Sequence, residues 1–117
     1  MLSRFITKIL ITTIAALVAS YLLAGIHINS FVTAFIVALV LAILNSFIKP
    51  ILIFLTLPIT ILTLGLFLLV INVLIIKWTA DLVSGFRVDG WLSALLFSFI
   101  VSVVTYVIEA LVGNNDK

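Results

Sequence analysis

Residues 51–76, ILIFLTLPITILTLGLFLLVINVLII, contain no charged side chain. Backbone amides in hydrocarbon must find hydrogen-bond partners within their own segment, so an apolar run of this length predicts membrane-embedded helix. As one straight helix, Ile51 to Ala80 would reach about 45 Å, which exceeds a hydrocarbon core of about 30 Å by about half. Pro58 removes an internal hydrogen bond and disfavours helix at Leu57. A break within the run is therefore predicted.

The composition of the whole chain indicates that lipid serves as its solvent. Of the 117 residues, 66% are hydrophobic and only 9% are charged, and the mean hydropathy is +1.56. A soluble domain has about a quarter of its residues charged. The charged residues are scattered singly, so no basic patch for nucleic acid is expected. We predict an all-α, polytopic membrane protein that forms a single transmembrane domain over residues 1–117.

Four apolar stretches are predicted to cross the bilayer as helices. The first runs from about Phe5 to Ala24, the second from about Phe31 to Ile48, and the last from Trp91 to Val112. The third span is expected from about Ile59 to Ala80, because each crossing needs about 20 apolar residues.

Pro50, Pro58 and Gly65 are the predicted helix breaks in the long apolar region. We expect Pro50 to Leu57 to form a short interfacial or re-entrant helix before the third span. A single tilted and kinked helix over the same residues is the competing interpretation.

The basic residues predict the orientation of the chain. Arg4 and Lys8 precede the first span, and Lys49 lies between the second and third. Four crossings bring all three to one side, which the positive-inside rule makes the cytoplasmic side. We therefore expect a bacterial inner-membrane protein with both termini in the cytoplasm. Arg87, in an outer loop, departs from the rule, although Asp81 and Asp89 offset its charge locally.

An internal repeat has an offset of 60 residues, from Gly25 to Gly85. The segment GIHINSFVTA (25–34) lies over GFRVDGWLSA (85–94), and nearly every pair is chemically alike. The repeat unit is a two-span hairpin, with unit 1 at about 5–49 and unit 2 at about 59–112. Because two spans return the chain to the same side, the units are expected to be parallel repeats about a pseudo-two-fold axis along the membrane normal.

Small residues in the two units form matching ridges on one face of each following helix. Small side chains let helices approach closely in lipid. The predicted helix-packing or pore-facing residues of the ridges are Ala34, Ala38 and Ala42 in the first unit and Ala94, Ser98 and Ser102 in the second.

Two asparagines lie within predicted spans, Asn72 near the middle of the third and Asn45 near the cytoplasmic end of the second. A buried amide that faces lipid is costly, so both should face another helix. Hydrogen bonding between helices is the simpler role, and lining a pore or substrate path is the alternative.

Two ion pairs are predicted. Lys49 and Glu109 are repeat equivalents of opposite charge near the cytoplasmic interface, and they could pair or could extend separately to the headgroups. Lys77 and Asp81 are four residues apart on one helix face, which favours a local pair.

No catalytic or cofactor-binding pattern is found in the sequence. The chain has no cysteine and a single histidine, His27, which is not enough for a metal site. There is no serine–histidine–acid set, phosphate-binding glycine loop or helical metal motif. We therefore expect a non-enzymatic protein without cofactor.

The central motifs resemble those of a known family. They are Asn45, the Lys49-Pro50 step, and the runs LTLPI (55–59), LG (64–65) and VIN (70–72), followed by GFRVDG (85–90). On these residues the chain resembles phage holin family 4 (superfamily IV), the YvlD-like four-span membrane proteins, over nearly its whole length. The resemblance implies a bacterial inner-membrane location and an activity in which many copies open large lesions that release endolysin.

Three functions therefore remain as hypotheses. The leading one is a holin-like protein that forms lesions by self-association as a homo-oligomer. The alternative is a non-lytic envelope accessory or stress-response protein with a membrane protein partner. A small dimeric transporter or channel is the third, but it needs a carboxylate deep in the membrane, and Glu109 lies close to a helix end.

Overall fold

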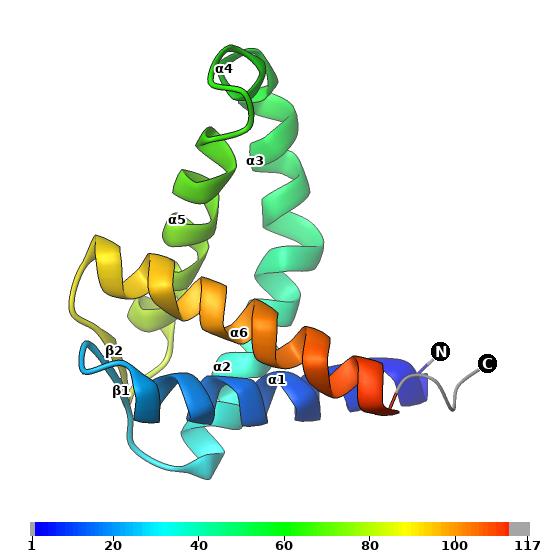
Figure 1. The fold of residues 1–117 in the computed structure, drawn as a ribbon, viewed down its shortest axis with the longest axis vertical. Coiled ribbons are helices and arrows are strands. Elements are labelled where there is room, and N and C mark those ends of the chain that lie inside the picture. Colours follow the sequence, from blue (N-terminus) through cyan, green and yellow to red (C-terminus); the bar gives the residue numbers. More distant parts are fainter. Residues whose placement is uncertain (1, 113–117) are drawn as a thin grey trace.

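The computed structural model describes residues 2–112. The chain is all-α apart from a short two-stranded ribbon (Figure 1). In chain order the elements are α1 (Leu2–Leu22), β1 (Ile26–Ile28), α2 (Phe31–Ile43), the π-helical turn η1 (Leu44–Ile48), α3 (Lys49–Leu55), α4 (Leu57–Leu62), α5 (Phe67–Leu82), β2 (Phe86–Val88) and α6 (Trp91–Val112).

Helices α1 and α6 lie side by side and run in opposite directions (Figure 1). Both are continuous apolar helices, within which Ser3–Leu22 and Trp91–Val112 are long enough to cross a membrane. They run crosswise to the hairpin that α3 and α5 form, whose tip is α4. The first and last helices thus make one side of the molecule and the middle helices the other.

A single helix runs from Phe31 to Leu55 through α2, η1 and α3, and it is the third segment long enough to cross a membrane. The side chain of Ser30 caps its start by accepting a hydrogen bond from the Thr33 backbone N–H. The prediction that the span ends at Ile48 and that Pro50 breaks the helix was wrong. A proline ring inside a helix collides with the carbonyl one turn earlier, and the π-helical turn before Pro50 opens the backbone there, with the Lys49 N–H bonding to the Leu44 carbonyl.

The helix ends instead at Thr56, and α4 follows with Pro58 in its first turn, where a missing N–H is tolerated. The short helix is thus 57–62 and not Pro50 to Leu57. Leu64 (φ 57°) and Gly65 (φ 89°) then reverse the chain in left-handed conformations. This turn delays the next helix, so α5 begins at Phe67 rather than at Ile59 and has 16 residues.

The loops after α1 and α5 pair with each other as the antiparallel strands β1 and β2. Ile26 lies opposite Val88, His27 opposite Arg87 and Ile28 opposite Phe86. Beyond the strands, the Asn29 N–H donates to the Gly85 carbonyl and the Asp89 N–H donates to the Gly25 carbonyl. Each hydrogen bond is therefore repeated with its partners exchanged at the offset of 60 residues.

Close contact between these loops explains why positions 25 and 85 are glycine. A Cβ at Gly25 would overlap the side chain of Ser93, and a Cβ at Gly85 would lie 2.7 Å from the Asn29 amide nitrogen. Gly85 also has a positive φ of 91°, which disfavours any other residue. Both loops therefore require glycine at the point where they cross the opposite chain segment.

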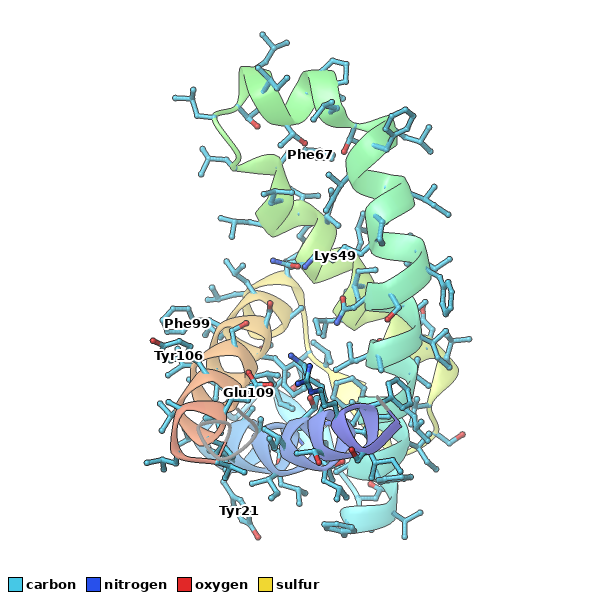
Figure 2. The ribbon with its side chains drawn as sticks, turned by 90° about the vertical axis from the view of Figure 1, so that its right-hand side faces the viewer. Tyr21, Lys49, Phe67, Phe99, Tyr106 and Glu109 are labelled. Carbon is cyan, nitrogen blue, oxygen red and sulfur yellow. The ribbon has the colours of Figure 1, made fainter. Side chains whose placement is uncertain are left out.

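The core lies where α1, α2, α5 and α6 meet the ribbon, and small residues fill much of it. Ala16, Ala19, Ala34 and Ala94 are fully buried, beside larger side chains such as Phe97. The outer surface is apolar, with Tyr21 and Phe99 projecting outward (Figure 2) and Leu62 83% exposed. An apolar outside and a close-packed inside suit a bundle surrounded by lipid.

Candidate functional site

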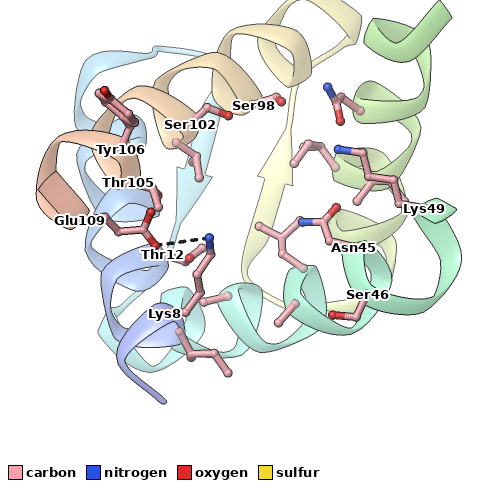
Figure 3. A pocket seen from close by; sticks show the side chains of 18 of the residues that line it. Lys8, Thr12, Asn45, Ser46, Lys49, Ser98, Ser102, Thr105, Tyr106 and Glu109 are labelled. Carbon is pink, nitrogen blue, oxygen red and sulfur yellow. Dashed lines mark ion pairs between the residues drawn. The ribbon is translucent and has the colours of Figure 1, made fainter. Parts of the chain in front are cut away.

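A cavity of about 660 Å³ is lined by α1 and α6 on one side and by α2, η1 and α5 on the other, and these helices pack together beyond it (Figure 3). Its walls are mixed, with apolar side chains such as Ile9, Leu41 and Ile75 beside many polar ones. The polar lining comprises Thr12, Asn45, Ser46, Asn72, Ser98, Ser102, Thr105 and Tyr106. A hollow that combines apolar and polar walls inside a largely apolar bundle is the structure's clearest candidate for a functional site.

Helical spacing explains why these residues share one cavity. On α6 the lining residues Ser98, Ser102, Thr105 and Glu109 recur every three or four positions, so they form one stripe on the helix. The continuous helix of α2, η1 and α3 contributes a similar stripe: Ala38, Ala42, Asn45 and Lys49. Lys8 and Thr12 do the same on α1.

Most of the predicted packing or pore-facing residues lie at this cavity. Asn45 and Asn72 line it. So do the second and third members of each small-residue ridge, Ala38 and Ala42 in the first and Ser98 and Ser102 in the second. Ala34 and Ala94, the first member of each ridge, are instead fully buried in the core. The ridges thus pack helices together near the ribbon and line the hollow farther along.

The charges at the cavity pair differently from the prediction. Glu109 Oε2 lies 3.4 Å from Lys8 Nζ, and within residues 2–112 no ion pair joins Glu109 to Lys49. Lys49 stands across the cavity from Glu109 (Figure 3). The reason is that α6 packs directly against α1, whereas the cavity separates α6 from the helix that carries Lys49.

The second predicted pair, Lys77 with Asp81, is also missing from the described part of the chain. Both residues lie on α5, where their spacing would allow contact. A basic residue that precedes its acidic partner by four positions is the less favourable order in a helix, because it opposes the helix dipole.

The ribbon holds a separate charged cluster at the opposite end of α1 and α6. Asp89 Oδ2 lies 3.2 Å from His27 Nε2, and Asp89 Oδ1 lies 3.3 Å from Arg87 Nε. The hydrogen bond from His27 lowers the pKa of the Asp89 carboxyl below its ordinary value, and the positive charge nearby adds to that effect. No group of three or more metal-binding side chains occurs in residues 2–112.

Sequence reasoning missed that the loops after α1 and α5 pair and that Arg4, Lys8 and Tyr106 line the cavity. Two signals could have found them. The apolar residues at alternate positions in each loop, Ile26 with Ile28 and Phe86 with Val88, fit short strands. Lys8 and Thr12 are four positions apart, so they share a helix face.

Thr105 is chemically unusual among the lining residues. Its Oγ1 is buried and has no hydrogen-bond partner in the part of the chain that the structure describes. Thr13, fully buried on α1, shows the usual arrangement, in which the hydroxyl donates to a carbonyl one turn earlier, here Ile9 at 2.8 Å. The cavity wall therefore includes an unsatisfied hydroxyl.

Comparison with known proteins agrees with this architecture of long apolar helices. The family model described as "Mycobacterial 4 TMS phage holin, superfamily IV" matches residues 3–107. The chain belongs to this holin family. It is a membrane protein, as its apolar helices require.

Two curated bacterial proteins are similar in sequence to this holin-family chain. The uncharacterized membrane protein YvlD of Bacillus subtilis is 40% identical over 107 residues, which cover 91% of this chain and 90% of YvlD. An uncharacterized protein of Streptomyces coelicolor is 43% identical over 88 residues, covering 72% of this chain and 70% of that protein. No solved structure matches the chain.

Proposed function

We propose that this holin-family protein crosses the bilayer four times, with α5 as the fourth crossing. The Lys8–Glu109 ion pair joins the start of α1 to the end of α6, so both ends of the chain belong to one face. If α1 and α6 both cross, the chain between them must cross an even number of times. The α2–α3 helix supplies one of these crossings. The other is α5, whose 16 residues make a helix about 24 Å long.

The four crossings are proposed to form two parallel hairpins related by a pseudo-two-fold axis. The exchanged hydrogen bonds Asn29 to Gly85 and Asp89 to Gly25 support this symmetry. So does the strand register, which is symmetric about the pair His27 and Arg87. The cavity extends from the mid-helix residues toward Lys8 and Lys49, on the side of the chain ends.

We infer that the chain ends and α4 face the cytoplasm of a bacterial inner membrane. Arg4, Lys8 and Lys49 gather at that end, and basic residues are retained on the cytoplasmic side. Fusing reporters to both termini tests this orientation. Reporters that are active on opposite sides of the membrane would refute it.

The proposed activity is the formation of membrane lesions by self-association, without catalysis. One observation carries it: polar side chains of α1, η1, α5 and α6 share one cavity, while large apolar side chains cover much of the outer surface. Separation of the α1–α6 side from the α2–α5 side would expose these polar walls. Four helices do not surround a wide lumen, so several opened copies would have to line one hole together.

Inducible expression in a bacterium with a potential-sensitive dye and a co-expressed endolysin tests this activity. The unaltered protein is expected to depolarise cells and release the enzyme. Asn72→Leu with Ser102→Leu removes two polar groups from facing walls of the cavity and should reduce both effects at equal membrane levels. Phe54→Leu, an outward-facing apolar change, is the matched control and should behave as the unaltered protein.

A non-lytic accessory role is the second candidate, and a specific observation favours it. Ala34 and Ala38, on the ridge suited to helix association, are buried within the chain and are not left free for other copies. This role predicts that cells remain polarised at high expression and that a partner protein co-purifies in detergent.

A further inference from the structure

The charges around the cavity do not balance. Arg4, Lys8 and Lys49 line it, and Glu109 is the single acidic lining residue among residues 2–112. Glu109 pairs with Lys8, so their charges offset each other. Neither Arg4 nor Lys49 has an ion pair within residues 2–112. In the described part of the chain, the cavity therefore has two positive charges without a negative partner.

Unpaired positive charges in a membrane-embedded hollow favour an anionic ligand. Charged groups at membrane depth are costly unless they pair or reach water. Guanidinium and ammonium groups form their strongest hydrogen bonds with carboxylate and phosphate oxygens. Among the anions that a bilayer itself supplies, the phosphate of a lipid headgroup has this chemistry.

The remaining lining fits an amphiphile better than a bare ion. Ser98, Ser102 and Asn72 provide hydroxyl and amide groups for a polar headgroup, and Phe5 and Ile75 provide apolar surface. The volume of about 660 Å³ lies within the range of about 300–1,000 Å³ typical of small-molecule sites, and greatly exceeds what one phosphate ion fills.

We propose that the cavity binds the phosphate-ester headgroup of an anionic glycerophospholipid, with Arg4 and Lys49 as the residues that recognise the phosphate. Soluble phosphate esters share this chemistry, but the apolar wall assigns the site to a lipid. The proposal goes beyond lesion formation and does not depend on it, because binding is measured on purified protein and lesions are measured in cells.

Native mass spectrometry of the full chain in neutral detergent tests the proposal directly. Titration with phosphatidylglycerol is expected to yield a one-to-one complex, and phosphatidylcholine at the same concentrations much less of it. Lys49→Gln should weaken phosphatidylglycerol binding about fivefold, since one basic residue near an anionic lipid contributes about 1 kcal/mol. Lys49→Arg keeps the charge and should restore it.

Two further variants separate this site from general attraction to positive charge. Lys77→Gln removes a positive charge that does not line the cavity, and it should leave binding unchanged. Glu109→Gln frees Lys8 from its ion pair, so it should strengthen binding. Circular dichroism and gel filtration establish that each variant is folded. Equal loss of binding in Lys77→Gln and Lys49→Gln would overturn the proposal.

Glycerol 3-phosphate and inorganic phosphate distinguish the two sources of the ligand. Neither should displace the lipid at concentrations comparable to it, because neither contacts the apolar wall. Binding of these soluble ions with no preference for phosphatidylglycerol over phosphatidylcholine would refute a lipid site.

Discussion

Lys8 Nζ and Glu109 Oε2 lie 3.4 Å apart, which links the first turns of α1 to the last turns of α6. The two side chains are 59% and 42% exposed, so we expect the pair to contribute up to about 1 kcal/mol. Lys8→Glu and Glu109→Lys should each lower the thermal midpoint in detergent, because each brings two like charges together. The double exchange should recover most of the loss.

Lys49 provides the matched control for this cycle. Lys49→Glu combined with Glu109→Lys restores opposite charges at the repeat-equivalent positions, which face each other across the cavity. No recovery is expected there, because the cavity keeps the two side chains apart. If the Lys49 pair recovered stability and the Lys8 pair did not, α6 would pack against the helix that carries Lys49 and not against α1.

The second prediction concerns the ribbon of β1 and β2. The chain has no native cysteine, so introduced cysteines can be tested in pairs. His27 and Arg87 are directly opposed across β1 and β2, at a Cα separation of about 5.5 Å or less for such pairs. This separation is within disulfide range. His27→Cys with Arg87→Cys should therefore cross-link under mild oxidation, as a mobility shift on a non-reducing gel. His27→Cys with Ser84→Cys, out of register, should cross-link much less.

The sequence allowed the helical, membrane-embedded character of the chain to be predicted, because it follows from composition and from hydrogen bonding in hydrocarbon. Periodicity also indicated which faces of α2, η1 and α6 carry the lining residues Ala38, Asn45, Ser98 and Ser102.

Predictions from local sequence were wrong where the backbone can adopt more than one conformation or where packing between helices decides the contact. A proline usually ends a helix, but the π-helical turn at 44–48 lets the helix continue through Pro50. The partner of Glu109 depended on which helix packs closest to α6, and this is a property of tertiary structure that spacing along one helix does not encode.

Asp89 makes stability depend on pH. The pKa of the Asp89 carboxyl is lowered in the folded protein, mainly by the hydrogen bond from His27. The carboxyl therefore binds a proton less readily in the folded protein than in the unfolded protein. The stabilisation is therefore complete above the unfolded pKa of about 3.9 and is lost as the pH falls through the lower folded pKa. Asp89→Asn should lower the thermal midpoint at pH 6, and the difference from the unaltered protein should shrink below about pH 4.

Asp81→Asn is the comparison for that measurement. Asp81 is exposed on α5 and has no ion pair in residues 2–112, so its removal should leave the midpoint nearly unchanged at pH 6. An Asp89→Asn difference that persists undiminished at pH 3 would mean that packing, and not charge, accounts for the effect.

Thr105 tests whether the unsatisfied hydroxyl in the cavity wall is costly. Thr105→Val keeps the shape of the side chain and removes a buried oxygen that has no partner among residues 2–112, so the ligand-free protein should gain about 1 kcal/mol in detergent unfolding. Thr13→Val removes an equally buried hydroxyl that donates to the Ile9 carbonyl, and it should lose stability or change little. The difference between the two variants matters, because a general preference for valine over threonine in an apolar bundle would stabilise both variants alike. A Thr105→Val variant that is less stable than the unaltered protein would contradict a costly unsatisfied hydroxyl at this position.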